Sequence, residues 1–313
     1  MERPRVFITR RLAVDPASVL GAGIEIDLHD SELAPPRADL LRRAHDAAAL
    51  VPMVTDRIDA EVIEASPRLR IVANHGVGYD NVDVSNCTRR GIWVTNTPGV
   101  LTDSTADMTW ALILALARRL REGERLLRGG GFRGWTPTML LGRELNGKTL
   151  GILGYGRIGR AVARRAEGFG MRVLFTSRGG GVPFEELLEE SDVLSIHCPS
   201  TPQTHHLFGA AELLRMKRGA LLINTARGPI VDEAALVAAL EAGHLGGAAL
   251  DVFEHEPEVH PGLLSRDDVV LVPHLGSATV ETRQAMARAA LSQVELVLRG
   301  EPPTHPVNEV KEP

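Results

Sequence analysis

The sequence predicts an α/β protein with two parallel-sheet domains, and three observations support this fold class. Strand-length apolar runs alternate with helical segments along the 313-residue chain, and this alternation gives parallel sheets with helices on both faces. A glycine-rich turn joins one such run to an amphipathic segment near the middle of the chain. The chain is also longer than one hydrophobic core usually serves, so two domains are expected.

The first hundred residues read as one α/β domain. Strands are predicted at residues 5–9, 24–28, 48–54, 69–73 and 92–95. Helices are predicted between them, at residues 36–44 and 59–65. The loop at residues 74–81 follows a strand, at the edge where open α/β sheets bind ligands. In one interpretation its Gly76 and Gly78 expose backbone N–H groups to an anion, and in the other they form a turn without a ligand.

A long helix and an apolar segment come next. Thr97-Pro-Gly99 breaks the chain, and residues 102–104 offer N-cap side chains for an apolar helix that runs to Leu120. Such a helix fits a hinge between domains. The segment around Trp135 places a large aromatic and several aliphatic side chains outside any clear element. It is either an arm buried by a second subunit or a loop folded back on its own domain.

Residues 149–178 form a βαβ unit that carries the glycine-rich turn. A strand at 149–153 leads into Gly154-Tyr-Gly156-Arg-Ile-Gly159, and a helix and a second strand follow. The first glycine makes the tight turn, the second lets the backbone approach a pyrophosphate, and the third lets helix pack on strand. The phosphates bind the helix N-terminus, where free N–H groups favour anions. The unit predicts dinucleotide binding rather than a glycine-rich turn alone.

The residues after the second strand select the dinucleotide. An acidic side chain there hydrogen-bonds the ribose 2′-OH of NAD, whereas an arginine accommodates the 2′-phosphate of NADP. This chain has Ser177 and Arg178, and a hydroxyl beside a guanidinium can hold phosphate through charge-assisted hydrogen bonds. The sequence therefore favours NADP over NAD. If Arg178 is only a solvated surface charge, both cofactors bind.

The final helix returns the chain to the first domain. Further strands are expected at residues 193–197, 220–223, 248–252 and 269–272. The last helix begins near residues 277–279 and ends at Gly300, and it carries an apolar face suited to packing on the first domain: Met286, Ala290, Val294 and Val297. We therefore predict a discontinuous substrate domain, residues 1–99 plus 280–313, into which a dinucleotide-binding domain, residues 100–279, is inserted.

Composition argues against several other classes of function. The formal net charge is −5 and no basic block is present, which argues against nucleic acid or membrane as a partner. Cys87 and Cys198 lie far apart and predict no disulfide framework. His205 and His206 are adjacent and make a poor ligand set, so no metal is predicted. Without a signal peptide or a bilayer-length apolar run, we expect a cytoplasmic protein.

Three polar residues follow strand ends in the second domain and predict a catalytic centre: Arg227, Glu256 and His274. All three are expected to face the crevice where nicotinamide binds. An arginine fork can hold a substrate carboxylate with two parallel hydrogen bonds. A histidine backed by a carboxylate can pass a proton to a carbonyl oxygen as hydride reaches carbon. Each residue also has a plainer interpretation, as a surface ion pair, a member of a solvated cluster or a loop histidine.

At these residues the chain resembles the D-isomer-specific 2-hydroxyacid dehydrogenases, most closely their glyoxylate/hydroxypyruvate reductase branch. The likeness covers almost the whole chain. Its motifs are Val77-Gly-Tyr-Asp-Asn-Val-Asp83, Thr95-Asn-Thr-Pro-Gly-Val-Leu-Thr-Asp103, the glycine turn, Asn224-Thr-Ala-Arg-Gly228, Leu250-Asp-Val-Phe253 with Glu256-Pro257, and Pro273-His-Leu-Gly-Ser-Ala-Thr279. The resemblance implies two doubly wound, Rossmann-like domains.

The resemblance also implies roles for individual residues. Arg227 would bind substrate, Glu256 would pair with the catalytic histidine, and His274 would be that histidine. The backbone of Val77 and Gly78 would bind the substrate carboxylate. Trp135 would reach the active site of the neighbouring subunit in a homodimer. The residues that would contact the cofactor are Thr105, Gly154, Tyr155, Gly156, Arg157, Ile158, Gly159, Ser177, Arg178, Cys198, Pro199, Thr225, Ala226, Asp251, Gly276 and Ser277, with Asp251 at the nicotinamide carboxamide.

One segment departs from the family pattern. Where family members usually place a short helix and another strand, this chain has only Gly179-Gly-Gly-Val182. We therefore expect a lost or shortened edge strand and an open pocket beside Arg178.

The implied function is an NAD(P)-dependent oxidoreductase that reduces small 2-oxo acids to 2-hydroxy acids. Glyoxylate is the expected substrate and hydroxypyruvate the next, with hydride from NADPH or NADH and with His274 as the acid/base. A short-form phosphoglycerate dehydrogenase, or another D-2-hydroxyacid dehydrogenase, is the alternative within the same class. A non-catalytic protein that senses NAD(P)(H) is the alternative from another class, although the presence of all three catalytic residues counts against it.

Overall fold

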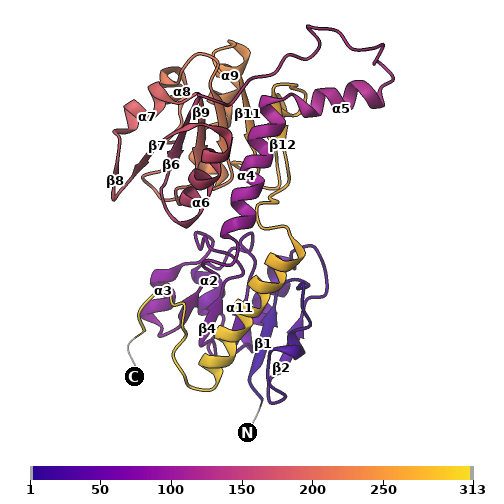
Figure 1. Ribbon diagram of the computed structural model, residues 1–313. Coiled ribbons are helices and arrows are strands. Elements are labelled where there is room, and N and C mark those ends of the chain that lie inside the picture. The colour runs from indigo at the N-terminus through magenta and orange to yellow at the C-terminus, as the bar shows by residue number, and fades with distance from the viewer. Residues whose placement is uncertain (1–2, 311–313) are drawn as a thin grey trace. The chain divides into compact units, whose positions relative to one another are not determined.

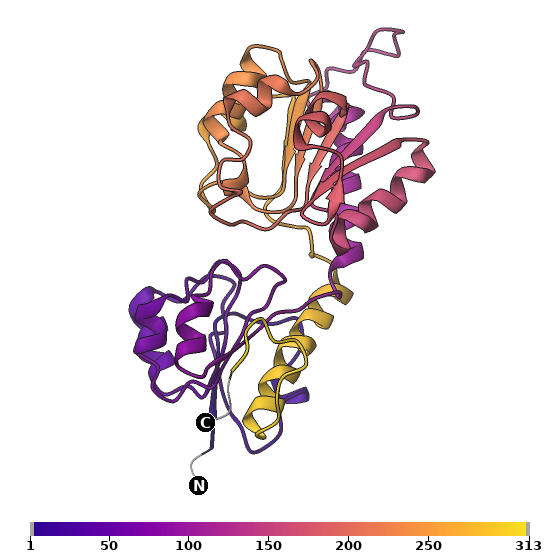
Figure 2. The ribbon, with the colours of Figure 1, turned by 90° about the vertical axis from the view of Figure 1, so that its left-hand side faces the viewer.

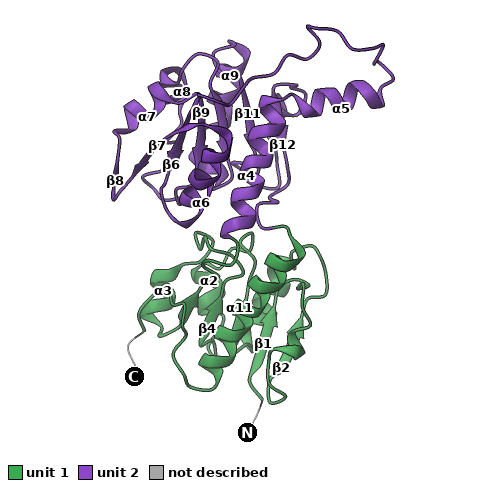
Figure 3. Cartoon of the chain, viewed as in Figure 1, with its two compact units in different colours: residues 1–101, 278–313 green, residues 102–277 purple. Residues whose placement is uncertain are grey.

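The computed structural model describes residues 3–310, and the chain divides into two compact units (Figures 1 and 3). Unit 1 comprises Met1–Leu101 and Ala278–Pro313, and unit 2 comprises Thr102–Ser277. Each unit holds one mainly parallel sheet with helices on both of its faces (Figure 2). The predicted fold class of two parallel-sheet α/β domains is therefore confirmed.

Unit 1 is built on a five-stranded parallel sheet in the order β2-β1-β3-β4-β5. The strands are β1 (Arg5–Ile8), β2 (Glu25–Leu28), β3 (Ala49–Val51), β4 (Ile71–Ala73) and β5 (Trp93–Thr95). Helices α1 (Arg37–His45), α2 (Ala60–Glu64) and α3 (Val84–Arg89) pack on one face. The sequence did not predict α3, because its Ser, Asn and Thr residues hide the apolar period.

Helix α11 (Val280–Leu298) covers the other face of this sheet (Figure 2). Its N-cap is Thr279, whose hydroxyl accepts the Thr282 N–H. Apolar side chains of the helix pack against those of the strands: Ala290, Leu291, Val294 and Val297 meet Val6, Ile8, Val51 and Ile71. Each fully buried aliphatic side chain of this kind contributes about 1.5–3 kcal/mol relative to exposure, so α11 is a major part of the core of unit 1.

Unit 2 holds a seven-stranded sheet in the order β12-β11-β10-β9-β6-β7-β8. The strands are β6 (Thr149–Leu153), β7 (Arg172–Ser177), β8 (Gly180–Gly181), β9 (Val193–Ile196), β10 (Leu221–Asn224), β11 (Gly247–Leu250) and β12 (Val269–Leu271). One face packs on α4 (Thr102–Ala117) and α6 (Arg157–Ala166). The other packs on α7 (Phe184–Glu190), α8 (Ala210–Arg215), α9 (Glu233–Glu241) and α10 (Pro261–Leu264).

The long helix expected before the glycine turn is two helices. Helix α4 begins at Thr102 and ends at Ala117, and α5 (Leu120–Arg128) follows. Arg118 and Arg119 lie between them, and Arg119 has a φ of 52°, in the left-handed region that ends a helix. The predicted N-cap at residues 102–104 is also wrong, because these residues already lie inside α4.

The edge strand β8 has two residues and runs antiparallel to β7. It is the shortened edge strand expected from the sequence. Gly181 has a φ of 108°, and a Cβ there would lie 2.1 Å from the Phe175 carbonyl oxygen. The chain therefore needs glycine to make this tight return.

Two further observations complete the description of the fold. Both cysteines, Cys87 and Cys198, are free thiols. Across residues 3–310, none of the helices combines the length and the apolar composition needed to cross a bilayer.

Candidate active site

Three neighbouring strands of unit 2 deliver Arg227, Glu256 and His274 to one edge of the sheet. Strands β10, β11 and β12 are adjacent and parallel, so their carboxyl ends meet at the same edge. Arg227 follows β10, Glu256 lies in the loop after β11, and His274 follows β12. This is the edge at which open α/β sheets bind ligands.

His274 and Glu256 form a hydrogen-bonded pair. Nδ1 of His274 lies 3.1 Å from Oε2 of Glu256, and the Phe253 N–H donates to Oε1 of Glu256 at 3.1 Å. Burial works to raise the pKa of Glu256, but the hydrogen bond and charge of His274, the Phe253 N–H and the Arg227 charge outweigh it, and the pKa falls below its ordinary value. The carboxylate thus stays ionised and holds the ring by Nδ1, which leaves proton transfer to Nε2.

The turn that carries His274 is held by Asp251. His274 has a φ of 54°, and its N–H donates to the Asp251 carbonyl oxygen at 2.9 Å. The Asp251 carboxylate accepts the N–H groups of Leu275 and Gly276. Asp251 is only 1% exposed, and burial raises its pKa even though the two N–H groups and the His274 charge act to lower it. Asp251 therefore fixes the backbone on which the histidine sits.

The loop that carries Arg227 is held by Asn224, which the sequence analysis did not single out. The Asn224 amide donates to the Arg227 carbonyl oxygen at 2.8 Å, and its oxygen accepts the Ala226 N–H at 3.0 Å. The next residue, Gly228, packs on the Glu256 loop so closely that a Cβ would lie 1.9 Å from the Phe253 carbonyl. The Arg227 charge acts on the pKa of Glu256, which places the guanidinium within electrostatic reach of that carboxylate.

The glycine-rich turn has the geometry that a dinucleotide requires. Gly154 has a φ of 95°, and a Cβ there would lie 2.5 Å from Cys198 N. A Cβ at Gly159 would lie 2.2 Å from the Gly154 carbonyl oxygen, whereas a Cβ at Gly156 would meet no atom within 4 Å. Helix α6 begins directly after Gly156 without a side-chain cap. The outer two glycines thus allow close packing, and the middle one faces the open space that a pyrophosphate would fill.

The adenosine end of the predicted site lies at β7. Ser177 donates its hydroxyl to the Gly180 carbonyl oxygen at 3.1 Å, and Arg178 is exposed. Tyr155 stacks on Phe175 with ring centroids 3.9 Å apart. The short β8 leaves the Arg178 side chain in solvent at the edge of the sheet.

Other predicted cofactor residues follow the same edge of unit 2. Cys198 and Pro199 come directly after β9, and burial raises the pKa of the Cys198 thiol to about 11, so the thiol is neutral. Thr225, which follows β10, lies 3.0 Å from Thr109 of α4, hydroxyl to hydroxyl. A Cβ at Gly276 would lie 3.4 Å from the Thr105 methyl group. The remaining members of the set flank these positions: Arg157, Ile158, Ala226 and Ser277.

The other predicted substrate residues, Val77, Gly78 and Trp135, do not follow the strands that carry the catalytic three. Val77 and Gly78 belong to unit 1, in the loop after β4, and both are half-buried. Trp135 follows α5 and is 78% exposed. Helix α5 and the segment after it extend away from the rest of unit 2 (Figure 1).

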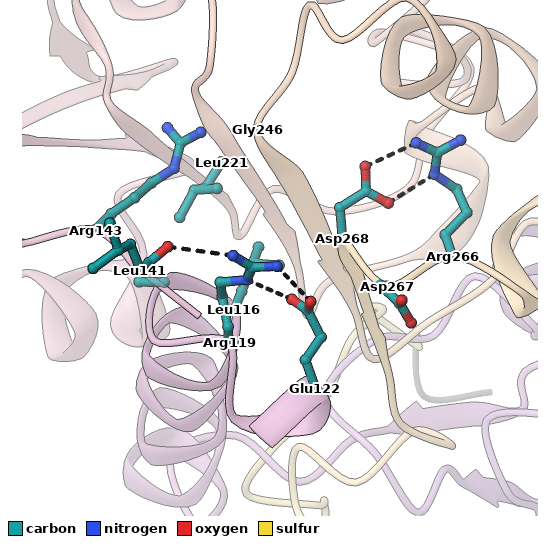
Figure 4. Close-up of a pocket in the computed structure, with 12 residues that line it drawn as sticks. Leu116, Arg119, Glu122, Leu141, Arg143, Leu221, Gly246, Arg266, Asp267 and Asp268 are labelled. Carbon is teal, nitrogen blue, oxygen red and sulfur yellow. Dashed lines mark hydrogen bonds and ion pairs between the residues drawn. The ribbon is translucent and has the colours of Figure 1, made fainter. Parts of the chain in front are cut away.

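A cavity of about 510 Å³ in unit 2 lies at the other end of the strands (Figure 4). Leu221 begins β10, and Gly246 and Asp268 directly precede β11 and β12. Four charged groups of the cavity pair with one another, Arg119 with Glu122 and Arg266 with Asp268. We therefore assign the chemistry to the carboxyl edge, where the catalytic side chains and the glycine turn lie.

Comparison with known proteins identifies the family of the chain. Residues 110–276 match the family model described as "D-isomer specific 2-hydroxyacid dehydrogenase, NAD binding domain". The glyoxylate reductase of Thermococcus litoralis is 47% identical over 321 aligned residues, which cover 98% of this chain and 97% of the relative.

Two solved structures extend the comparison. An NADPH-dependent glyoxylate/hydroxypyruvate reductase from Sinorhizobium meliloti, in complex with NADP and malonate, matches with a TM-score of 0.83 at 36% identity and covers 98% of both chains. A D-lactate dehydrogenase from Aquifex aeolicus, complexed with NAD and lactic acid, matches with a TM-score of 0.81 at 30% identity and covers 95% of this chain and 96% of that one. The family predicted from the sequence is thus confirmed, and the chain belongs to the D-isomer-specific 2-hydroxyacid dehydrogenases.

Proposed function

We propose that this protein reduces glyoxylate, and hydroxypyruvate as a second substrate, to the corresponding 2-hydroxy acid with NADPH or NADH. The observation that carries the proposal is the His274–Glu256 pair, 3.1 Å apart and within electrostatic reach of Arg227, at the same sheet edge as the open glycine turn. The relative from T. litoralis and the neighbour from S. meliloti, both named for glyoxylate, support this choice of substrate.

The residues of this chain divide the reaction between binding and proton transfer. The Arg227 fork holds the substrate carboxylate and orients the neighbouring carbonyl. When bound at the glycine turn, the cofactor supplies the hydride that reaches the carbonyl carbon. Protonated His274 gives its Nε2 proton to the carbonyl oxygen as the new C–H bond forms, and Glu256 stabilises the positive charge of the ring before that transfer. In the oxidation direction neutral His274 takes the proton back.

We assign cofactor binding to unit 2 and substrate-carboxylate binding to the loop at Val77 and Gly78 in unit 1. NADP is the favoured cofactor because Arg178 is exposed beside Ser177 with no carboxylate at that position. The S. meliloti neighbour holds NADP and the A. aeolicus neighbour holds NAD, so both cofactors belong in the assay. In Arg178→Ala we expect the preference for NADPH over NADH in kcat/KM to fall about tenfold or more, because a charge-assisted contact to phosphate is lost. Arg172→Ala, at the other end of β7, is the matched control.

We also propose that a second copy of the chain covers the segment after α4. Five exposed large hydrophobic residues lie within this short stretch: Leu120, Leu127, Phe132, Trp135 and Leu141. Burial of such side chains is typical of subunit interfaces. A Trp135→Ala variant should raise KM if Trp135 reaches the neighbouring active site, and sedimentation velocity measures whether the protein is a dimer.

Steady-state kinetics with a panel of 2-oxo acids tests the function. We expect turnover of glyoxylate and hydroxypyruvate with NADPH. Turnover of phosphohydroxypyruvate alone would favour a phosphoglycerate dehydrogenase. Cofactor binding without turnover of any 2-oxo acid would favour the non-catalytic sensor and end the proposal.

A further inference from the structure

In the loop after β4 in unit 1, three successive carbonyl groups, those of Gly76, Val77 and Gly78, accept hydrogen bonds. The Thr97 N–H donates to the Gly76 carbonyl oxygen at 3.0 Å. The side-chain amide of Asn96 donates to the Val77 carbonyl oxygen at 2.8 Å. Both donors follow β5, the strand next to β4, so the neighbouring strand end holds two consecutive peptide groups of the loop.

The third carbonyl group, that of Gly78, is held by a buried side chain. Asn74 is 0% exposed, and its side-chain amide donates to the Gly78 carbonyl oxygen at 2.7 Å. The Asn74 side-chain oxygen accepts from the Asn81 amide at 3.1 Å. That Asn81 nitrogen also donates to two backbone carbonyl oxygens, so the orientation of both side-chain amides is determined by their partners.

Because a trans peptide is planar, its N–H points opposite to its carbonyl oxygen. The N–H groups of Val77, Gly78 and Tyr79 therefore point away from the protein donors that hold the three carbonyl groups. Across residues 3–310, none of these three N–H groups donates to another protein group. Val77 and Gly78 are half-buried and Tyr79 is 43% exposed, so none of the three residues is fully buried.

Successive backbone N–H groups without protein acceptors can form an anion-binding concavity. We propose that Asn74 and Asn96 are positioning residues that hold this loop for one carboxylate of the substrate, and that the Tyr79 N–H is a third donor beside those of Val77 and Gly78. This inference rests on the proposed function for the identity of the ligand as a 2-oxo acid. The two asparagines touch the loop and act through its backbone.

The test is steady-state kinetics of Asn96→Ala and Asn74→Ala with glyoxylate and NADPH. In each variant one peptide loses the hydrogen bond that orients it, so KM for glyoxylate should rise about tenfold, the effect of one typical hydrogen bond. Because neither side chain joins the proton transfer, kcat should stay within about threefold. The dissociation constant of NADPH should not change. An unchanged KM in both variants would overturn the proposal.

Asn308→Ala is the matched control for general loosening of unit 1. Asn308 is 8% exposed, donates to the Ile92 carbonyl oxygen and the Thr88 hydroxyl at 2.9 Å each, and accepts the Val94 N–H at 2.8 Å. Its side chain therefore anchors β5 with three hydrogen bonds, against two for Asn74 and one for Asn96, and none of the three involves the loop. Its loss should lower Tm and leave KM unchanged. An equal rise of KM in Asn308→Ala would overturn the positioning role.

Oxalate binding separates failure of this inference from failure of the proposed function. Oxalate is a small dicarboxylate, and its dissociation constant in the presence of NADPH is measured by calorimetry without turnover. If the wild-type protein reduces no 2-oxo acid, the proposed function fails, and a roughly tenfold weaker binding of oxalate by Asn96→Ala would still support the loop. Equal binding by wild type and variant, or no binding by either, would overturn the inference.

Discussion

The two parallel sheets present different chemistry at the edges where their strands end. In unit 1 that edge presents backbone N–H groups, held by the Asn74 and Asn96 side chains. In unit 2 it presents side chains, with His274 against Glu256 and Arg227 nearby. A backbone site binds a fixed charge without changing its own protonation, whereas proton transfer requires a titratable side chain. In the proposed function proton transfer therefore belongs to unit 2, whereas both units offer groups that can bind a carboxylate, and the predictions below compare the two units.

The largest expected effect is the loss of the proton donor in unit 2. His274→Asn should lower kcat about 10²- to 10⁴-fold, the usual contribution of general acid catalysis, with NADPH affinity unchanged. Asparagine is chosen because it tolerates the left-handed backbone that His274 adopts, with φ 54°. Stopped-flow single-turnover measurements with glyoxylate would check the effect on the chemical step.

His206→Asn provides a closely matched control for that substitution. His206 also lies in unit 2, has a φ of 48° and pairs with a carboxylate, Glu254, at 2.7 Å. Its removal should change kcat less than about threefold, since the proton route uses a different ring. A comparable loss in both variants would mean that the effect comes from the loops and not from the acid.

Arg227→Lys should have the next largest effect. Lysine keeps the charge but cannot make two parallel hydrogen bonds to a carboxylate. We expect KM for glyoxylate to rise about 10- to 100-fold with a smaller fall in kcat, because the variant loses one or two charge-assisted hydrogen bonds to the substrate carboxylate. A KM within twofold of wild type in initial-rate assays would show that charge alone is sufficient.

Two glycines compare the rigidity of the edges. A Cβ at Gly228 would lie 1.9 Å from the backbone carbonyl of Phe253, whereas a Cβ at Gly76 would meet the Val54 side chain at 2.3 Å. Backbone yields less than a side chain, so Gly228→Ala should cost about 3 kcal/mol of unfolding free energy and Gly76→Ala about 1–2 kcal/mol, within the range of overpacking. Urea denaturation measures both, and the reverse order would contradict this comparison.

The smallest effect concerns the dependence of stability on pH. Burial and the Arg283 charge lower the pKa of His75 in unit 1 to about 4, and burial lowers that of His197 in unit 2 to about 3. The unfolded chain binds these protons near the ordinary histidine pKa of about 6.5. Each neutral histidine therefore makes its full contribution to the free energy of unfolding above about pH 6.5. This contribution falls as the pH is lowered, until about pH 4 for His75 and about pH 3 for His197.

His75→Leu and His197→Leu should each flatten this decline, by about 1–2 kcal/mol between pH 7 and pH 5. The two variants should differ at pH 7. Across residues 3–310 neither ring nitrogen of His75 has a hydrogen-bond partner, so leucine should stabilise unit 1. The His197 ring lies 2.8 Å from the Ser195 hydroxyl, so leucine leaves that hydroxyl unpaired and should destabilise unit 2. Urea denaturation at both pH values measures the free energy of unfolding of each variant. If this free energy declined between pH 7 and pH 5 as steeply as in the wild type, the assignment of these protons would be contradicted.

Most of the fold could be predicted because the signals were local. Buried parallel strands appear as short apolar runs, and the glycine turn with its flanking strands has a fixed spacing. The break at Arg119 between α4 and α5 was missed, because the apolar period continues across it and a left-handed arginine has no sequence signature. Several strands were also predicted to be longer than they are, for example 48–54 for β3 and 69–73 for β4, since apolar residues continue past the last hydrogen-bonded pair.

The candidate site divides in the same way. Arg227, Glu256 and His274 could be predicted as candidates because charged residues soon after apolar strands are conspicuous. Asn224, Asn74 and Asn96 were not singled out, although each lies at or next to a strand end. An asparagine there is equally typical of an ordinary turn, and its role follows only from which carbonyl group its amide reaches. That information depends on the three-dimensional path of the neighbouring loop.

The position of α11 has a consequence for biosynthesis. The five strands of unit 1 leave the ribosome before unit 2, but the helix that covers one face of their sheet is translated after it. Until then Ile8, Val51 and Ile71 have no apolar cover on that side, whereas residues 102–277 can already complete their own core. Unit 1 of the nascent chain thus lacks part of its core during most of the synthesis. Its exposed aliphatic side chains are a target for chaperones that recognise such surfaces.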